Sequence, residues 1–374
     1  MKIGIYTDAH FSKSSSVLTG SSDTSKYSKR LDSLIHSFEY MYDIFHKEDV
    51  RMIFNLGDTV SATDLDADTI TALSEALSKN ETIPEYWLIG NHEKKTNDGS
   101  ITSIALVDNI DNIQLCDSDS KIMSITENVD VILCNHTTKS FEESVKSLCD
   151  SIEKDHNFLL LTHQCYKETL PFVNESAFSY NEITSNYPNL KRIFNGHIHT
   201  AFDDSKYCQI GSLIGNSFND DYSESFPRFV IYDTDTDNLT FYENPYSYIF
   251  VTIDLQNSID FESTLKDMFC KKNYISKSKN FLKDYRTLVR FRLLLSQKSN
   301  FEEFIDKNNL YELFNIYSYR VIYQNDLAVK SFENSTEVPE TENLNEKLLT
   351  FIESQENLPV SKSTMIEFIK KNIL

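Results

Sequence analysis

The sequence predicts a layered α/β fold, because short β-rich runs alternate with amphipathic helical patterns over its first two thirds. With 40% hydrophobic and 25% charged residues, its composition is that of a folded globular protein. The longest apolar runs, such as residues 158–161, are far shorter than the roughly 18 residues that a membrane span needs. We therefore expect a globular protein of two domains and a tail, with no membrane contact.

The expected elements follow one another along residues 1–245. Runs rich in β-branched and aromatic residues predict strands at 2–6, 52–56, 86–89, 130–134, 158–162, 192–195, 207–210, 229–232 and 239–242. The first helix starts near residue 31, where apolar positions recur at the spacing of one buried helix face. These positions are Leu34, Ile35, Phe38, Tyr42 and Phe45.

Two smaller parts follow the main α/β domain of residues 1–245. Residues 246–326 are predicted to form a small α+β domain, with strands at 250–255 and 288–295 and a helix at 261–270. Residues 327–374 are predicted as an acidic linker followed by two short amphipathic helices. The sequence leaves open whether these helices pack on the protein's own body or on a partner.

Charge is distributed unevenly along the chain. The formal net charge is −21, which argues against a protein that coats nucleic acid without specificity. Residues 1–250 carry −20, residues 251–326 carry +2 and residues 327–374 carry −3. The six cysteines form no CxxC pair, and the first residues lack a signal-peptide pattern, so we expect reduced thiols and a cytoplasmic protein.

Five segments at or just after predicted strands carry side chains suited to holding metal ions. They are Asp8-Ala9-His10, Gly57-Asp58, Gly90-Asn91-His92-Glu93, Thr162-His163 and Gly196-His197-Ile198-His199. Because strand ends converge on one edge of an α/β sheet, loops distant in sequence can deliver ligands to one place. Each segment alone is a weak signal, but the five together in this order favour a metal site.

The types of candidate ligand indicate which ions they suit. Carboxylate, imidazole and amide groups without any cysteine suit divalent Mn, Fe or Zn in a catalytic site. The seven candidates are too many for one tetrahedral ion, but they fit two ions that share a bridging carboxylate. Such a pair of ions is typical of enzymes that displace phosphoryl groups in line.

With these motifs, residues 1–245 resemble the calcineurin-like metallophosphoesterases, whose signature is DxH, GD, GNH[DE], H and GHxH in that order. The resemblance implies a four-layer αββα metallophosphoesterase sandwich followed by a small α+β cap domain and a C-terminal helical tail. It also implies two divalent metal ions, and His92 as the catalytic residue. The implied metal ligands are Asp8, His10 and His199 for one ion, Asn91, His163 and His197 for the other, and Asp58 as the bridge.

More narrowly, the chain resembles the SbcD-type nuclease subunit that bacteriophages carry for recombination. The support is residues 207–212, 216–218 and 229–235, which resemble the strand, Gly-Ser turn and closing strand that follow GHxH in those nucleases. This resemblance implies a Mn²⁺-dependent DNA exonuclease and endonuclease in DNA repair and recombination, with Mg²⁺ or another ion left open. It implies DNA and an SMC-like coiled-coil ATPase of the SbcC type as partners, a DNA-facing cap at 246–326 and ATPase-binding helices at 327–374. For a phage-encoded chain the location would be the host cytoplasm; a homodimer is left open.

One departure and two alternatives remain. The nucleases usually carry a His or Asp three positions after the Asp of the GD motif, where this chain has Ser61. A stand-alone phosphoesterase acting on a nucleotide or another small phosphate ester is the second hypothesis. A non-catalytic scaffold for the ATPase is the third, and the complete ligand set argues against it.

Overall fold

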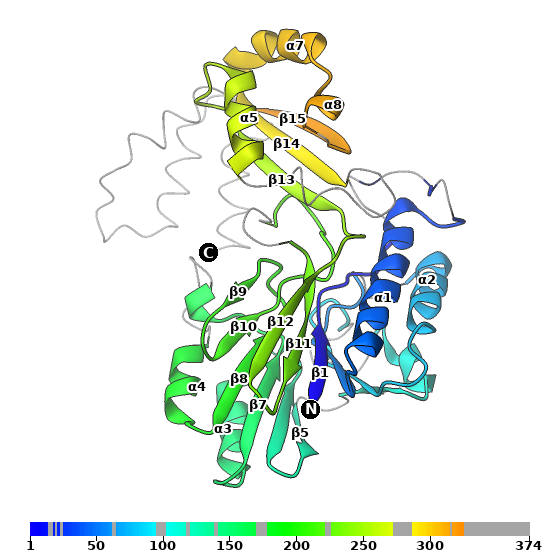
Figure 1. Ribbon diagram of the computed structural model, residues 1–374, viewed down its shortest axis with the longest axis vertical. Coiled ribbons are helices and arrows are strands. Elements are labelled where there is room, and N and C mark those ends of the chain that lie inside the picture. Colours follow the sequence, from blue (N-terminus) through cyan, green and yellow to red (C-terminus); the bar gives the residue numbers. More distant parts are fainter. Residues whose placement is uncertain are drawn as a thin grey trace, which may run out of the picture. The chain divides into compact units, whose positions relative to one another are not determined.

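The nine strands predicted within residues 1–245 are present and, with β4, β5 and β9, which were not predicted, form two six-stranded sheets (Figure 1). The computed structural model describes residues 1–13, 18, 21–22, 25–61, 65–94, 102–116, 120–137, 141–169, 178–220, 226–271, 286–314 and 316–324. The C-terminal helices predicted within residues 327–374 lie outside the described residues.

The first sheet has the strand order β12-β11-β1-β2-β3-β4. Strands β1 to β4 are parallel, and β11 and β12 are antiparallel to their neighbours. In β1 the side chains alternate, so Ile3 and Ile5 are buried between the sheets and Tyr6 packs under the helices. The bounds are β1 (Lys2–Tyr6), β2 (Met52–Asn55), β3 (Glu85–Trp87), β4 (Ile113–Leu115), β11 (Arg228–Asp233) and β12 (Asn238–Glu243).

The second sheet has the strand order β5-β6-β7-β8-β10-β9. Its four central strands are parallel and its two edge strands are antiparallel. Buried on both faces, β7 is apolar from Phe158 to Leu161. The bounds are β5 (Ser120–Thr126), β6 (Val129–Cys134), β7 (Asn157–Thr162), β8 (Leu190–Asn195), β9 (Phe202–Asp203) and β10 (Tyr207–Gln209).

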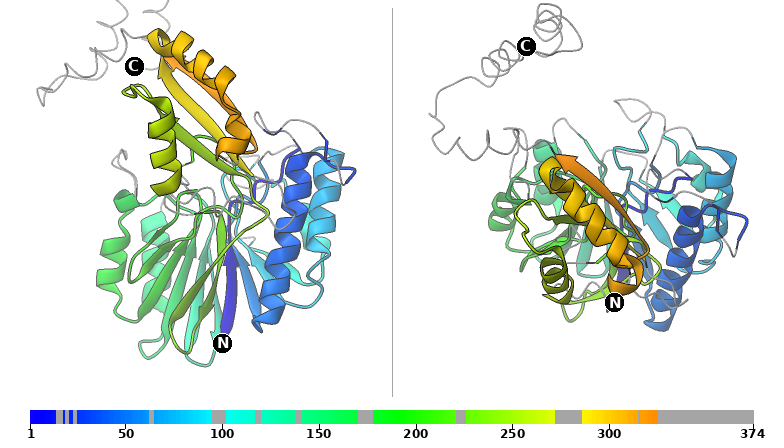
Figure 2. Two further views of the ribbon diagram at one scale, coloured as in Figure 1. Left: turned by 45° about the horizontal axis from the view of Figure 1, so that its top comes forward. Right: turned by 90° about the horizontal axis from the view of Figure 1, so that it is seen from above.

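Helices cover the outer face of each sheet, which confirms the predicted four-layer αββα arrangement (Figures 1 and 2). Helices α1 (Lys29–Lys47) and α2 (Ala67–Leu77) pack on the first sheet, and α3 (Phe141–Ser151) and α4 (Tyr180–Asn186) pack on the second. The N-cap of α1 is Ser28, and the N-cap of α2 is Asp66; each side chain accepts a backbone N–H of its first turn. Single 3₁₀ turns cover Ala105–Asn109 and Lys167–Thr169.

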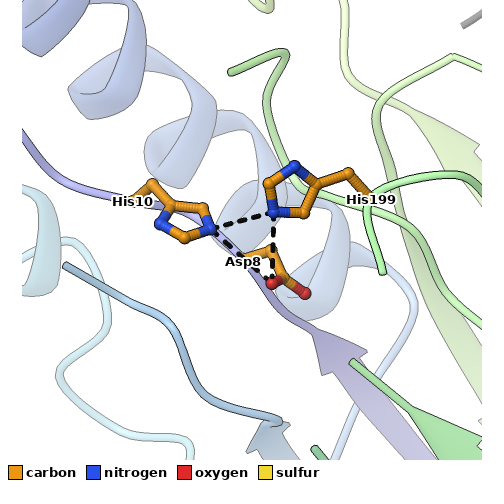
Figure 3. A group of neighbouring side chains, drawn as sticks. All are labelled: Asp8, His10 and His199. Carbon is orange, nitrogen blue, oxygen red and sulfur yellow. Dashed lines mark hydrogen bonds and ion pairs between the residues drawn. The ribbon is translucent and has the colours of Figure 1, made fainter. Parts of the chain in front are cut away.

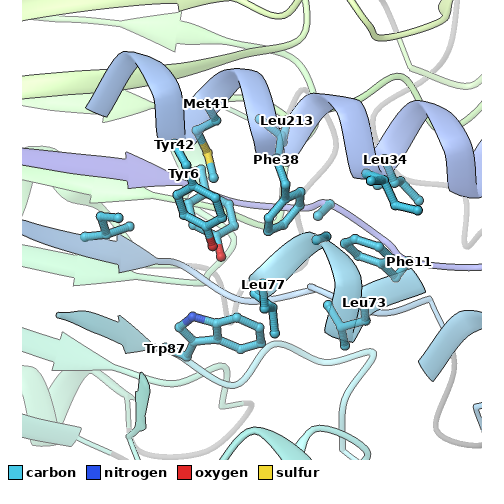
Figure 4. Packing of buried hydrophobic residues seen from close by; sticks show 14 of the residues in the cluster. Tyr6, Phe11, Leu34, Phe38, Met41, Tyr42, Leu73, Leu77, Trp87 and Leu213 are labelled. Carbon is cyan, nitrogen blue, oxygen red and sulfur yellow. The ribbon is translucent and has the colours of Figure 1, made fainter. Parts of the chain in front are cut away.

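A buried polar cluster fixes β1 and β3 relative to α1. Glu85 of β3 is 1% exposed and accepts hydrogen bonds from the hydroxyls of Tyr6 and Tyr42 and from the indole of Trp87, whose rings are neighbours in Figure 4. Burial raises the pKa of Glu85. Because β1 and β3 both lead into candidate metal-binding loops, this cluster also fixes where those loops begin.

A third sheet of three strands, in the order β13-β14-β15, follows the sandwich. Strands β13 and β14 are parallel, and Phe291 of β14 packs against Phe301 of α7 and Tyr319 of β15. The bounds are β13 (Ile249–Asp254), α5 (Phe261–Lys271), β14 (Thr287–Leu294), the 3₁₀ turn Leu295–Gln297, α7 (Lys298–Lys307), α8 (Leu310–Phe314) and β15 (Ser318–Gln324).

The chain divides into two compact units. The first comprises Met1–Leu293 and Gln297–Tyr323, and the second comprises Leu294–Ser296 and Gln324–Leu374. The domain boundaries expected at residues 245 and 326 stay a prediction. Within the described ranges no helix is long and apolar enough to cross a membrane. The described cysteines, which are Cys116, Cys134, Cys149, Cys165 and Cys208, carry thiols and form no disulfide.

Candidate metal centre

The candidate ligands lie where strands of both sheets end. Asp8 and His10 follow β1, and Asp58 follows β2 in the first sheet. Beyond these strands, the N–H of Asp8 donates to the carbonyl of Gly57 and that of His10 donates to the carbonyl of Asp58, each at 3.0 Å. The two loops therefore run side by side and bring three candidate ligands together.

Four of the candidate ligands have left-handed backbone conformations. Their φ angles are 53° at Asp8, 49° at His10, 50° at Asp58 and 72° at His197. For residues other than glycine this region costs roughly 1–2 kcal/mol each. Backbone strain gathered in this way is typical of functional sites, where the surrounding fold holds side chains in one orientation.

Asp8, His10 and His199 form the first cluster (Figure 3). The Nε2 atoms of the two histidines are 3.0 Å apart, and each lies 3.6 Å from Oδ1 of Asp8. Nδ1 of His199 lies 2.8 Å from Oδ1 of Asp220, a carboxylate oxygen that accepts the ring proton. His199 therefore turns the lone pair of its Nε2 toward the other two ligands.

Asp58, His163 and His197 form the second cluster. Nδ1 of His163 donates to the carbonyl of Leu56 at 2.7 Å, so Nε2 carries the lone pair when the ring is neutral. That Nε2 lies 3.1 Å from Oδ2 of Asp58. Asn91 follows β3 and precedes His92, whose N–H donates to Oδ1 of Asp58 at 2.9 Å.

The carboxylate of Asp58 lies between the two clusters. Its Oδ2 atom is 3.1 Å from Nε2 of His163 in the second cluster and 3.9 Å from Nε2 of His10 in the first. The side chain is only 2% exposed. Among the candidate carboxylates of the described site, only Asp58 has an oxygen within 4 Å of imidazole nitrogens of both clusters. Asp8 meets the second cluster through the backbone N–H of His197, which donates to its Oδ2 at 3.0 Å. Asp58 is therefore the residue best placed to bridge two ions.

At the site, the pKa values of the buried carboxylates and of the histidines depend on one another. Burial raises the pKa of Asp58, but the charge and hydrogen bond of His163 together with the charge of His10 outweigh burial and lower the pKa below its usual value. Burial lowers the pKa of His163, but the charge and hydrogen bond of Asp58, with the charges of Asp8 and Glu93, raise it to about 9. Burial also lowers the pKa of His199, but its hydrogen bonds to Asp220 and Asp8 and the charges of both carboxylates raise it to about 10. Burial lowers the pKa of His197 to about 4.

The donor atoms of these residues fit divalent cations. Oδ1 of Asp8, Oδ1 of Asn91, Nε2 of His163 and Nδ1 of His197 are buried, and none has a hydrogen-bond partner within the described part of the chain. Each of these atoms offers a lone pair, and leaving so many buried acceptors unpaired is costly. Two divalent cations, held by oxygen and imidazole nitrogen, would satisfy all four atoms.

Glu93 holds the loop that carries Asp58. Its fully buried carboxylate accepts the N–H groups of Asp58 at 3.0 Å and Val60 at 3.2 Å, and also that of Thr59. The N–H of Gly90 donates to the same carboxylate at 2.7 Å. Burial, followed by the charge of Asp58, raises the pKa of Glu93 to about 8.

Gly90 allows the loops after β2 and β3 to touch. A Cβ at this position would overlap the Asp58 carboxylate and lie 2.5 Å from the Asp58 backbone nitrogen. Gly196 faces similar crowding, since a Cβ there would overlap Thr7 and lie 2.9 Å from the ring of His163. At both positions the lack of a side chain lets the backbone approach the site closely.

His92, the predicted catalytic residue, has a side chain that is 44% exposed. Its Nδ1 lies 3.2 Å from the carbonyl of Ser61, its Nε2 lies 4.0 Å from Oδ2 of Asp58, and its ring meets that of His10 edge-on. The hydroxyl of Ser61 in turn donates to the carbonyl of His10 at 3.0 Å. Ser61 thus contacts His92 through its backbone and His10 through its side chain.

Two residues that the motifs did not single out lie at the site. Asp220, on the loop before residues 221–225, contacts His199, and no motif marks it in the sequence. His136 is not among the candidate ligands, but its ring centroid lies 5.3 Å from that of His197 and 6.1 Å from that of His163. Its only sequence signal was its position directly after a strand.

We compared the chain with known protein families, curated proteins and solved structures. The sequence profile of the calcineurin-like phosphoesterase family matches residues 1–201. No curated protein matches the sequence. Among solved structures, a dimetal phosphatase from Danio rerio is 12% identical, covers 62% of this chain and 91% of its own, and has a TM-score of 0.37.

Two further solved structures are similarly distant. The protein TT1561 of Thermus thermophilus is 10% identical, with 65% of this chain and 98% of its own covered and a TM-score of 0.41. The calcineurin-like phosphoesterase YfkN from Bacillus subtilis is 10% identical, with 73% and 96% covered and a TM-score of 0.36.

Proposed function

The chain belongs to the calcineurin-like phosphoesterase family, and we propose that it uses two divalent metal ions to cleave phosphodiester bonds in DNA. The observation that carries this proposal is the position of Asp58, whose carboxylate faces histidines of both ligand clusters. A bridging carboxylate between two ions is the usual arrangement for in-line displacement at phosphorus.

The residues of the two clusters would divide the work. Asp8, His10 and His199 would hold one ion, and Asn91, His163 and His197 the other, with Asp58 shared. When bound, such ions lower the pKa of a water molecule and offset negative charge that develops on the phosphate. The exposed ring of His92 is free to face the substrate, where it would donate a proton to the leaving oxygen.

Three arginines of the small sheet support a nucleic-acid substrate. Arg290 and Arg292 are two positions apart in β14 and therefore lie on the same face of the strand. The guanidinium groups of Arg290 and of Arg320 in β15 both lie over the ring of Phe218. Burial, followed by the charges of Arg292 and Arg320, lowers the pKa of Arg290, which places the three positive charges near one another. Arg320 is exposed and Arg292 is half-buried, and within the described residues neither forms a salt bridge, so these two charges are accessible to phosphates. Arg290 is buried and engaged with Phe218 and Thr252.

The acidic charge of the remaining chain favours a second candidate. Residues 1–250 carry a net charge of −20, which repels a polyanion and is better tolerated by a small substrate. A stand-alone phosphoesterase acting on a nucleotide or another small phosphate ester would need the same metal centre. The arginines of the small sheet would then have no role in substrate binding.

The finer proposal, a role in an SbcD-type complex, rests on the sequence resemblance. In that case a coiled-coil ATPase would bind the amphipathic segments within residues 344–374. Deleting residues 341–374 should then spare cleavage of a small phosphodiester and remove both co-purification with the ATPase and ATP-dependent processing of duplex DNA. Loss of small-ester cleavage together with a lower unfolding temperature would contradict the partner role.

The substrate is tested with the purified full-length chain in Mn²⁺ and, separately, in Mg²⁺. Linear duplex DNA and bis-p-nitrophenyl phosphate are offered as substrates. We expect the wild-type protein to cleave both substrates. The double variant Arg292→Gln, Arg320→Gln should cleave DNA at least about tenfold more slowly and should cleave the small ester at the wild-type rate. Removing two exposed charges elsewhere, with Lys121→Gln and Lys154→Gln, is the matched control and should slow DNA cleavage much less.

The outcomes separate the candidates. Cleavage of the small ester alone would favour the second candidate, and equal effects of the arginine and lysine pairs would remove the small sheet from DNA binding. Inactivity of the wild-type chain toward both substrates with either metal would contradict both candidates.

A further inference from the structure

The segment of residues 216–220 links the first ligand cluster to the three-stranded sheet. At one end of this segment Asp220 contacts His199, and near its middle Phe218 is 4% exposed and held by residues of β13 and β14. Phe218 belongs to the pattern that carries the narrower sequence resemblance, whereas no motif marks Asp220.

Asn216 ties the start of the segment to another candidate ligand. Nη2 of Arg30, a residue of α1 that is 4% exposed, donates to Oδ1 of Asn216 at 2.7 Å. The same nitrogen donates to the carbonyl of His10 at 3.0 Å. One guanidinium therefore fixes both the loop that carries His10 and the beginning of residues 216–220.

Phe218 ties the middle of the segment to the three-stranded sheet. Its carbonyl accepts Nη2 of Arg290 at 2.6 Å, and Nε of the same guanidinium donates to the hydroxyl of Thr252 at 3.0 Å. The guanidinium carbons of Arg290 and Arg320 lie 5.2 and 4.4 Å from the centre of the Phe218 ring. Phe218 is thus clamped through its backbone and its side chain.

Asp220 connects this clamp to His199. Its Oδ2 atom accepts the N–H of Ser217 at 2.9 Å, while its Oδ1 atom accepts the Nδ1 proton of His199 at 2.8 Å. The carboxylate is 11% exposed and is fixed by its own segment. A carboxylate that accepts the second ring proton of a metal-binding histidine sets the tautomer and makes the other nitrogen a better ligand.

We propose that Asp220 is the positioning residue for the metal site of Asp8, His10 and His199, and that Arg290, by clamping Phe218, makes the three-stranded sheet part of that site's support. This inference rests on the two-metal centre proposed above. It assigns to the small sheet a role in metal affinity that is separate from any contact with substrate.

Arg286 provides a matched control for Arg290. Both arginines are 7% exposed, and both donate to a backbone carbonyl and stack on an aromatic ring. The partners described for this hydrogen bond and this stacking contact of Arg286 are Tyr246 and Tyr248, which lie outside residues 216–220. Replacing either arginine therefore removes similar local contacts, but only the change at Arg290 loosens the hold on Phe218.

The test is calorimetric titration of Mn²⁺ into the metal-free full-length protein. Wild type should bind two equivalents, and Asp220→Ala should weaken one of them by about 10- to 100-fold, as for other residues that orient metal-binding histidines. Asp220→Asn keeps an acceptor oxygen and should weaken the same equivalent less. Arg290→Gln should weaken that equivalent several-fold, whereas Arg286→Gln should leave both unchanged.

Thermal unfolding of each metal-free variant separates positioning from general loosening of the fold. Equal unfolding temperatures for Arg290→Gln and Arg286→Gln with different metal affinities would support the inference. Wild-type affinity for both equivalents in Asp220→Ala, or equal affinities in the two arginine variants, would overturn it and leave the proposed function standing. Failure of wild type to bind two equivalents would instead overturn the two-metal centre itself, and the inference with it.

Discussion

Nε2 of His163 lies 3.1 Å from Oδ2 of Asp58, while Nδ1 of the same ring donates to the carbonyl of Leu56 at 2.7 Å. Because Nδ1 carries the proton, a neutral ring turns a lone pair toward the carboxylate. Two electron-rich atoms at this distance require a proton or a metal cation between them. Burial lowers the pKa of His163, but the charge and hydrogen bond of Asp58, with the charges of Asp8 and Glu93, raise it to about 9, which favours a proton at this position when no cation is bound.

The first prediction separates chemistry from metal binding. His92 contacts Asp58 through its backbone N–H and leaves its ring 44% exposed, so His92→Ala should still bind two equivalents of Mn²⁺. Its kcat toward bis-p-nitrophenyl phosphate should fall by about 10²- to 10⁴-fold, the range typical of general acid catalysis. Loss of a metal equivalent in this variant would make His92 a ligand.

The second prediction concerns Glu93. The carboxylate accepts four buried backbone N–H groups, and a glutamine in its place would keep one oxygen and leave about half of those donors unpaired. Glu93→Gln should lower the free energy of unfolding by about 2 kcal/mol or more. Urea unfolding measures the change.

An exposed glutamate serves as the control for Glu93. Glu303→Gln removes an exposed ion pair with Lys307 on α7 and should leave the urea midpoint nearly unchanged. A Glu93→Gln variant as stable as Glu303→Gln would show that the loop after β2 holds its shape without the clamp.

The third prediction concerns pH and lies away from the metal centre. Nδ1 of His156 lies 3.0 Å from Oδ2 of Asp130, and this hydrogen bond raises the pKa of His156. The pair therefore contributes stability that is fully present below the unfolded pKa, roughly 6.5, and that is lost as pH rises through the folded value.

Thermal unfolding at two pH values tests the pair. His156→Gln should lower the unfolding temperature more at pH 5.5 than at pH 9. When Asp130→Asn is added to the His156→Gln variant, the further loss of stability at pH 5.5 should be small and should come from the contact between Asp130 and Ser124. Equal losses for His156→Gln at both pH values would contradict the assignment.

Much of the fold and of the candidate site follows from local sequence. Strand β1 was predicted with its observed bounds, and the C-terminal ends of β2, β7 and β8 were predicted to within one residue. These strands are apolar runs followed by Gly, Asp or His, so the position where each strand ends is well defined by the sequence. Since the ligands follow these ends directly, predicting the strands also placed Asp8, Asp58 and His163.

Other parts could not be predicted from local pattern. Strands β4 and β9 have three and two residues, and such short runs carry no periodicity. Asp220 is separated from His199 by 21 positions, with β9 and β10 between them, so only the tertiary fold brings them together. The ring of His136 approaches His197 for the same reason, because β6 and β8 end at one edge of their sheet.

The metal content of Asp58→Asn tests the two-metal centre most directly. Full-length wild-type and variant protein are loaded with Mn²⁺, freed of unbound metal and analysed for bound manganese, with His36→Gln on α1 as a control outside both clusters. We predict two equivalents in wild type and in the control, and fewer than two in Asp58→Asn, with cleavage of bis-p-nitrophenyl phosphate lost in that variant alone. Equal bound manganese and equal rates in wild type and Asp58→Asn would contradict the bridge and the centre built on it.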